Sequence, residues 1–311
     1  MKLSRGKAII DIEGTFVNIY NSFVLKGEIF MNSLKGRVAI VTGASRGVGK
    51  GVALGLAEYG ATVYITGRTE DGKELPHFLK DTNIYKTSEE VTKLGGVGVP
   101  HKCDHSKDEE VELLFKRVIE EQGRLDILVN NAWGGGIHAM QEYFFNTPFW
   151  KQPVSLWDDN FTVGVRSNYV ASSFAAEIMM KQKCGLIVNI SFYGGRRYMN
   201  NVTYGVCKAA VDRLSADTAY ELKDYGVPVF SLYPGQVSTE GMIEYAKYDS
   251  NIDLGKMESP QFVGRCVAAL ANNENAIIDT GKVLITGEVA ERYGFTDIDG
   301  KQPKSLRSEL W

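Results

Sequence analysis

The chain has 311 residues, of which 44% are hydrophobic and 23% are charged, and its formal net charge is −3. A chain of this length can bury a substantial core, and its small acidic charge argues against a protein that binds nucleic acid through a basic surface. No apolar run reaches the roughly 20 residues that a membrane-spanning helix requires. The four cysteines show no paired spacing, which is typical of free thiols in a reducing compartment, so we expect a cytoplasmic protein.

The first residues have two interpretations. Ile9, Ile12 and Phe16 are spaced like one face of a helix, as in an arm that docks on a partner or on a membrane surface. Alternatively, the natural protein starts at Met31 and the start has been set too early. We expect residues 1–33 to be a leader that is poorly ordered or wrongly included, and residues 34–311 to form a single domain.

The first predicted strand leads into a glycine-rich turn. Residues 37–42 are apolar and β-branched, as in a buried strand. Gly43, Gly47 and Gly49 follow, and a helical pattern then runs to about residue 59. Glycines let the backbone approach a pyrophosphate, and the free N–H groups of a helix start attract it. The turn therefore predicts a dinucleotide-phosphate site; a plain tight turn between a strand and a helix is the alternative.

Strands and helices alternate along the rest of the chain, which predicts a parallel sheet covered on both faces. We expect an α/β fold with a doubly wound, Rossmann-type sheet of about seven strands and a cofactor site over their carboxyl ends. The expected strands are 37–42, 61–66, 97–102, 126–130, 185–190, 227–232 and 281–286. The expected helices are 47–59, 85–94, 107–122, 156–182, 203–225 and 259–272.

Two long segments between these elements are candidate substrate loops. Residues 133–156 are rich in aromatic side chains, which beside a cofactor cleft would suit a wall or lid for an apolar substrate. A subunit contact, or simple packing on the sheet edge, is an equal alternative. Residues 239–259 are polar and are the second lid candidate.

Tyr204 and Lys208 have a spacing that suits proton transfer. They are four residues apart on a predicted helix, so they lie on the same face. An ammonium group lowers the pKa of a nearby phenol from about 10, which makes a tyrosine usable as an acid or base near neutral pH. Ser191 ends a predicted strand thirteen residues before Tyr204. A serine in that place is otherwise a cap or turn residue.

Together these segments resemble the short-chain dehydrogenase/reductase family. Several independent motifs occur in the family's order, which makes the resemblance specific, and a late Arg-Tyr-Gly segment is typical of one type within it. The resemblance runs from about Leu34 to Tyr293 and is carried by residues 42–49, Asp104, Asn130 to Ala132, Ser191, Tyr204 with Lys208, and Pro234 with Gly235.

The resemblance implies a role for each of these residues. Tyr204 would be the acid, Lys208 would lower its pKa and bind the nicotinamide ribose, and Ser191 would hydrogen-bond the substrate oxygen. Asp104 would contact the adenine, unless it is a loop cap, and no metal is implied. The implied cofactor-binding residues are Gly43, Ser45, Arg46, Gly47, Val48, Gly49, Arg68, Asp104, Asn130, Lys208, Pro234, Gly235, Val237 and Thr239.

The chain departs from the family pattern at two positions. The family usually has an asparagine that holds a proton-relay water, and the matching position here is Gly164. Asn168, one helical turn further, could face the same way; otherwise water alone serves, or the relay is weak. Trp133 stands where a glycine is usual, which would narrow the pocket.

The residues after the second predicted strand favour NADP over NAD. A carboxylate at this place would bind the adenosine ribose and repel a 2′-phosphate, but the chain has Gly67 followed by Arg68. Arg46, in the glycine turn, supplies a second guanidinium for the phosphate. The alternative is that Arg68 is a solvated surface residue.

The sequence thus predicts an NADP-dependent oxidoreductase. It would transfer hydride between the nicotinamide and a carbonyl or secondary alcohol of an apolar small molecule. We expect a homodimer or homotetramer with no nucleic-acid partner. One alternative is an NADP-binding sensor or scaffold without turnover, and another is an NAD-linked sugar or steroid alcohol dehydrogenase.

Overall fold

A computed structural model describes residues 33–73, 75–199 and 201–310, so nearly all of the expected leader lies outside the described residues. Seven parallel strands form one sheet in the order β3-β2-β1-β4-β5-β6-β7, which confirms the predicted fold. Their bounds are β1 Val38–Val41, β2 Thr62–Gly67, β3 Val97–Lys102, β4 Ile127–Asn130, β5 Leu186–Ile190, β6 Val229–Tyr233 and β7 Val283–Ile285.

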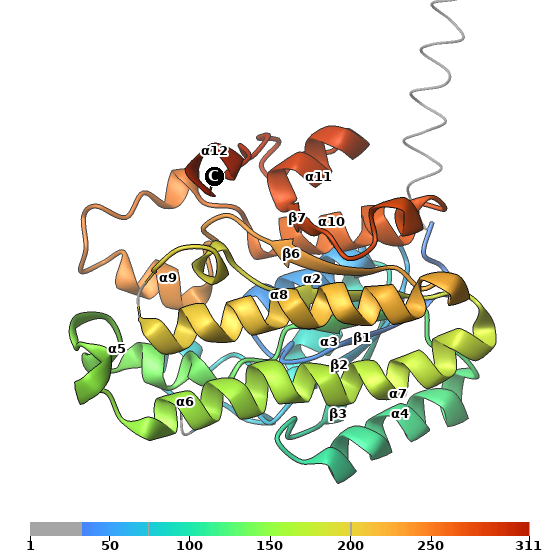
Figure 1. Cartoon of the computed structure of the whole chain (residues 1–311), viewed down its shortest axis with the longest axis horizontal. Helices are drawn as coiled ribbons and strands as arrows, with labels where there is room; N and C mark the ends of the chain where they lie inside the picture. The colour runs from blue at the N-terminus through green and yellow to red at the C-terminus, as the bar shows by residue number, and fades with distance from the viewer. Residues whose placement is uncertain (1–32, 74, 200, 311) are drawn as a thin grey trace, which may run out of the picture.

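Helices cover both faces of this sheet (Figure 1). On one face lie α4 (Asp108–Gln122), α7 (Ser167–Gln182) and α8 (Val202–Leu222), whose apolar side chains form one core cluster with the sheet. The other face is covered by α2 (Gly47–Ala57), α3 (Ile84–Lys93), α10 (Pro260–Ala271) and α11 (Thr286–Tyr293). Since each face of the sheet is buried, its strands are apolar along their length.

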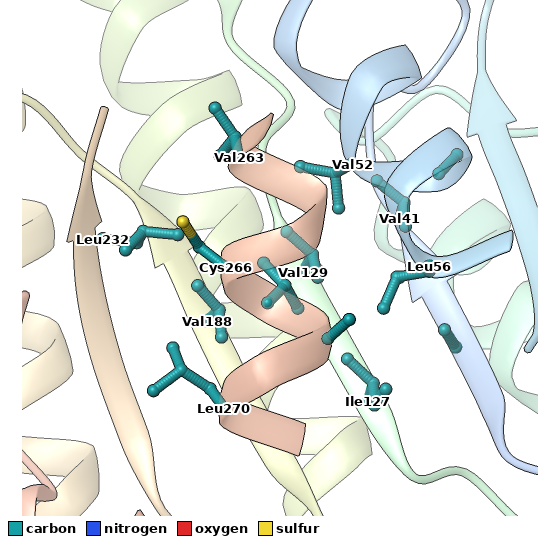
Figure 2. Close-up of a cluster of buried hydrophobic side chains, with 14 of the residues drawn as sticks. Val41, Val52, Leu56, Ile127, Val129, Val188, Leu232, Val263, Cys266 and Leu270 are labelled. Atoms are coloured by element: carbon teal, nitrogen blue, oxygen red, sulfur yellow. The ribbon is translucent and has the colours of Figure 1, made fainter. Parts of the chain in front are cut away.

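Helices α2 and α10 approach each other backbone to backbone. A Cβ atom at Gly55 would lie 2.5 Å from the carbonyl carbon of Gly264, and one at Gly51 would lie 2.0 Å from that of Pro260. The glycines are therefore required by the close crossing. Figure 2 shows the core beneath it, where side chains of α10 and α2 meet those of the strands. The cluster includes Val41, Val52, Leu56, Ile127, Val129, Val188, Leu232, Val263, Cys266 and Leu270.

The predicted helix over residues 156–182 is wrong in one respect, because it is interrupted. Helix α6 (Val154–Phe161) passes into a π-helical turn, η5 (Thr162–Arg166), before α7 begins. Val163 has φ −114° and ψ 79°, which are not helical values. The apolar pattern continues through the break, so periodicity alone could not reveal it.

Short helices occupy the two candidate loops and the end of the chain. The strand expected over 281–286 ends at Ile285, and the chain turns directly into α11. The remaining α-helices are α5 (Tyr143–Asn146), α9 (Glu240–Tyr245) and α12 (Arg307–Leu310). The 3-10 turns are η1 His77–Leu79, η2 Gly134–Gly136, η3 His138–Met140, η4 Phe149–Lys151, η6 Tyr193–Gly195, η7 Lys223–Tyr225, η8 Leu254–Lys256 and η9 Ala276–Asp279.

Within the described part of the chain, no helix has the length and apolar character needed to cross a membrane. The same residues contain no cluster of histidine, cysteine and carboxylate side chains that could hold a metal ion. All four cysteines are free, and Cys184 is exposed whereas the other three are buried.

Candidate active site

Ser191, Tyr204 and Lys208 meet at the carboxyl edge of the sheet. Ser191 follows β5, and its Oγ donates to the carbonyl oxygen of Lys208 at 3.3 Å. Lys208 lies one turn after Tyr204 on α8, and its Nζ lies 5.8 Å from the centre of the Tyr204 ring. The same Nζ donates to the carbonyl oxygen of Ile190 at 3.1 Å. The structure therefore brings the three predicted residues together, while their roles stay predictions.

Tyr204 stands in an aromatic environment at the start of α8. The helix is capped by Asn201, whose side chain accepts a hydrogen bond from the Tyr204 N–H at 2.8 Å. Trp133 and Phe192 pack edge-on against the phenol ring, with centroids 5.7 and 6.5 Å away. Burial raises the pKa of Tyr204, since charge is disfavoured in an apolar surrounding. The direction is therefore opposite to the lowering expected from Lys208, because burial disfavours the phenolate.

Lys208 is also buried, which lowers the pKa of its ammonium group, while Cys207 and the Asp212 carboxylate raise it in part. Asp212 lies one further turn along α8 and accepts a short hydrogen bond from the Tyr233 hydroxyl. Burial raises the pKa of Asp212. Ser191 and Ser231 are near enough to lower the pKa of the Asp212 carboxyl in part. The sequence analysis missed this residue, although its position two turns from Tyr204 on the same helix face could have indicated it.

A chain of buried polar side chains lies behind these residues. Ser231 donates to Ser215 at 2.9 Å, and Asn189 donates to the same hydroxyl oxygen at 2.8 Å. Asn130 in turn donates to the Asn189 side chain at 2.8 Å and to Ser172 at 2.9 Å. Asn130, which the resemblance implies is a cofactor-binding residue, therefore ties β4 to β5 and α7.

Gly164 lies in the π-helical turn between Trp133 and Cys207. A Cβ atom there would be 3.3 Å from the Cys207 sulfur and 3.6 Å from Cδ1 of Trp133. Asn168 is buried in α7, and its carbonyl oxygen accepts from Asn130 at 3.4 Å. Asn160, which the sequence analysis did not single out, is fully buried and accepts a hydrogen bond from the Trp133 indole at 2.6 Å.

The glycine turn has the features of a phosphate cradle. Gly43 and Gly47 have φ of 65° and 59°, which a residue without Cβ adopts readily. A Cβ atom at Gly49 would lie 2.4 Å from the Gly43 carbonyl oxygen. Thr42 fixes the turn to β4, because its Oγ1 accepts from the N–H groups of Asn131 and Ala132 at 2.8 and 2.9 Å. The first N–H groups of α2 follow at once, as a diphosphate requires.

Two guanidinium groups lie at the end of β2 beside this turn. Arg46 donates to the Thr69 hydroxyl at 2.5 Å, and its Nε is buried with no hydrogen-bond partner. Burial lowers the pKa of Arg46, nearby Glu240 raises it, and nearby Arg68 lowers it. Arg68 is exposed, directly after Gly67, the last residue of β2. The arrangement brings both predicted arginines to one place.

Other predicted cofactor residues line the same edge. Asp104 accepts from both the N–H and the hydroxyl of Ser106, at 3.0 and 2.8 Å, as expected of the loop-cap alternative. Ser45 is buried in the glycine turn, next to partly buried Val48. Pro234 and Gly235 follow β6 directly and are buried.

Behind Gly235 lies the buried Glu258, which the sequence analysis also missed. A Cβ atom at Gly235 would lie 2.8 Å from its Oε1, and the same oxygen accepts from Thr286 at 2.7 Å. Burial raises the pKa of Glu258 to about 7. Val237 forms an isolated parallel bridge with Glu258. This bridge holds together the two ends of the segment 239–257.

The two candidate substrate loops meet at an aromatic contact. Phe144 is buried against Trp133, with centroids 6.2 Å apart, and Phe145 stacks on Tyr245 of α9 at 6.2 Å. His138 joins the first loop to α6 through Asp159, at 2.7 Å. Figure 1 shows α5 and α9 side by side at the same end of the molecule.

Comparison with known proteins gives the same family as the motifs. The profile of the short chain dehydrogenase family matches residues 37–249. Dehydrogenase/reductase SDR family member 1 of Mus musculus is 46% identical over 286 residues, covering 88% of this chain and 87% of that protein. The Homo sapiens protein of the same name is 42% identical and covers 86% and 85%.

Solved structures show the same fold. A 7α-hydroxysteroid dehydrogenase complexed with NADH and 7-oxo glycochenodeoxycholic acid is 26% identical, with a TM-score of 0.66 over 81% of this chain and 93% of that one. A short-chain type dehydrogenase/reductase from Mycobacterium marinum is also 26% identical, with a TM-score of 0.66 over 83% and 96%.

Proposed function

Because the chain belongs to the short-chain dehydrogenase/reductase family and is of the member 1 type, we propose that it is an NADP-dependent reductase of apolar carbonyl compounds, or a dehydrogenase of the corresponding alcohols. The family binds a nicotinamide cofactor, and the glycine turn fits one. The observation that carries the proposal is the meeting of Ser191, Tyr204 and Lys208 at the sheet edge that also holds this turn.

The chain's own residues would handle the substrate oxygen and its proton. When bound, the nicotinamide supplies or accepts the hydride. As charge develops on the carbonyl oxygen, Tyr204 donates its proton and Ser191 donates a hydrogen bond. Lys208 holds positive charge beside the phenol and stabilises the phenolate that remains. Trp133 and Phe192 pack against Tyr204, and Phe144 packs against Trp133. This apolar surface favours an apolar substrate and excludes water.

The preference for NADP is supported by Arg46 and Arg68. The charge of Arg68 is near enough to lower the pKa of Arg46 in part, and a 2′-phosphate between the two guanidiniums would be attracted to both. Gly67 presents no carboxylate against that phosphate. The NADH bound to the 7α-hydroxysteroid dehydrogenase keeps an NAD-linked steroid dehydrogenase as the second candidate.

The test is turnover with a panel of aromatic diketones, quinones and steroid ketones, using NADPH and NADH in parallel. We expect oxidation of NADPH with at least one aromatic substrate. Nucleotide binding without any oxidation across the panel would favour the sensor, and faster steroid reduction with NADH would favour the second candidate.

We also propose that the protein acts in a reducing compartment as a homodimer or homotetramer. An apolar surface groove runs across α6, η5, α7 and α8, and it is lined by Phe161, Val165, Tyr169 and Leu214. Tyr169 is 59% exposed. Burial of such a surface favours association. Light scattering after size exclusion should give a mass at least twice that of the chain.

A further inference from the structure

Glu240 connects the second substrate loop to the cofactor cradle. It is the first residue of α9, and its Oε2 accepts a hydrogen bond from the Gly47 N–H at 2.9 Å. Gly47 is in turn the first residue of α2. The contact therefore places a carboxylate of the 239–257 segment at the amino end of the helix that follows the glycine turn.

An anion is well matched to this position. The first N–H groups of a helix have no partner within the helix, and its dipole attracts negative charge. Arg46 adds a guanidinium, whose pKa Glu240 raises against the effect of burial. The Glu240 carboxylate thus occupies the Gly47 N–H, one of the free donors at a helix start of the kind that binds a dinucleotide diphosphate in such folds.

The segment that carries Glu240 is held at its base by backbone hydrogen bonds. The Ser238 N–H donates to the Glu258 carbonyl oxygen at 2.9 Å, and the Glu258 N–H donates to the Gln236 carbonyl oxygen at 2.8 Å. Helix α9, which follows this base, is held by the Glu240 contact at its start and by the stacking of Tyr245 on Phe145 at 6.2 Å. Release of Glu240 would therefore move α9 while the base of the segment stays in place.

We propose that Glu240 sets cofactor affinity by competing with the dinucleotide diphosphate for the glycine turn, so that binding of the cofactor releases α9. The inference rests on the proposed function. The Gly47 N–H cannot donate to Glu240 and to the diphosphate at the same time. While Glu240 accepts from it, the glycine turn cannot bind the cofactor, so only a fraction of the protein is competent to bind the nucleotide. The apparent dissociation constant of the nucleotide equals the intrinsic constant divided by this competent fraction, so the apparent affinity is lower.

The test is the dissociation constant of NADPH and of NADH, measured by quenching of protein fluorescence without any substrate. Glu240→Gln keeps the size of the side chain and removes its charge. Glu244→Gln is the matched control, because Glu244 lies one turn further on α9 and is paired with Lys247 at 2.6 Å. We expect both nucleotides to bind about 3- to 10-fold more tightly to Glu240→Gln, and no change in the control.

Hydrogen exchange gives an independent measurement. Backbone amides of residues 240–246 should exchange faster when NADPH is added to the unmodified protein, and should already exchange fast in Glu240→Gln. Unchanged or weaker nucleotide binding by Glu240→Gln would overturn the inference. Tighter binding of NADPH alone would also overturn it, since both nucleotides carry the diphosphate. If the unmodified protein binds neither nucleotide, the proposed function fails first and the inference with it.

Discussion

The indole of Trp133 stands edge-on to the phenol of Tyr204, with ring centroids 5.7 Å apart, and its N–H is fixed by Asn160 at 2.6 Å. A bulky residue that replaces the family's usual glycine is thus held in one orientation against the proposed acid. The contact places a fixed apolar surface beside Tyr204 on the side of the π-helical turn.

Removal of the indole N–H should destabilise the protein. Trp133→Phe leaves the buried Asn160 oxygen without this donor, which costs about 1–3 kcal/mol. The free energy of unfolding in urea measures the loss. Trp157→Phe is the control, because Trp157 is 42% exposed and stacks on Phe161. Equal losses in the two variants would show that the Asn160 bond contributes nothing specific.

Removal of the Tyr204 hydroxyl should abolish most turnover. We expect Tyr204→Phe to lower kcat by at least about 100-fold, the usual scale for a general acid, while nucleotide binding stays nearly intact. Lys208→Ala should weaken both. Tyr220→Phe, on the same helix and 72% exposed, is the control. Near-normal kcat in Tyr204→Phe would rule out the mechanism.

Cofactor preference should follow the residues after β2. A charge-assisted arginine–phosphate bond contributes about 1.5–3 kcal/mol, so kcat/KM should favour NADPH by at least about 10-fold at low salt. Gly67→Asp with Arg68→Ala should shift the preference to NADH. Rising salt should weaken the preference in the unmodified protein. Equal kcat/KM for the two nucleotides at low salt would contradict the assignment.

Glu258 should make stability depend on pH. Burial raises its pKa to about 7, so the folded state holds a proton more tightly than the unfolded state. Its stabilising effect is full below the unfolded pKa of about 4.5 and is lost as pH rises through about 7. Glu258→Gln should therefore reduce the fall in unfolding free energy between pH 5 and 8 by up to about 3 kcal/mol. Glu274→Gln, at an exposed site, should leave that fall unchanged, and the same result for Glu258→Gln would refute the prediction.

Gly55→Ala should destabilise the protein although alanine favours a helix by about 1 kcal/mol. The new Cβ would lie 2.5 Å from the backbone of Gly264, and such overpacking costs about 1–3 kcal/mol. Gly241→Ala is the control, since its Cβ would meet nothing closer than 3.9 Å. Thermal unfolding of both variants gives the comparison, and a stabilised Gly55→Ala protein would contradict the close crossing.

The sheet and the meeting of Ser191 with Tyr204 could be predicted because both depend on local pattern. Apolar β-branched runs mark the strands, and the ends of parallel strands share one edge. The break before α7 could not be predicted, since it depends on how Trp133 and Cys207 pack around Gly164. The pKa direction of Tyr204 was wrong for a related reason: four-residue spacing places Lys208 nearby, but only the fold determines how deeply the phenol is buried.

Contacts between Asp212 and Tyr233, or between Glu240 and Gly47, join segments that no periodicity relates. Nothing in the local sequence distinguishes Glu240 from a solvated carboxylate. Asp212 alone carried a usable signal, because it continues the helix face of Tyr204 and Lys208.

The crossing of α2 and α10 also has a consequence for biogenesis. Helix α2, which follows the glycine turn, is completed early in synthesis. Its backbone partner around Gly264 emerges from the ribosome about two hundred residues later. Until then the apolar face of α2 has no cover on that side. A nascent chain would therefore expose this surface for many seconds at ordinary rates of translation, and we expect it to be a site for chaperone binding during synthesis.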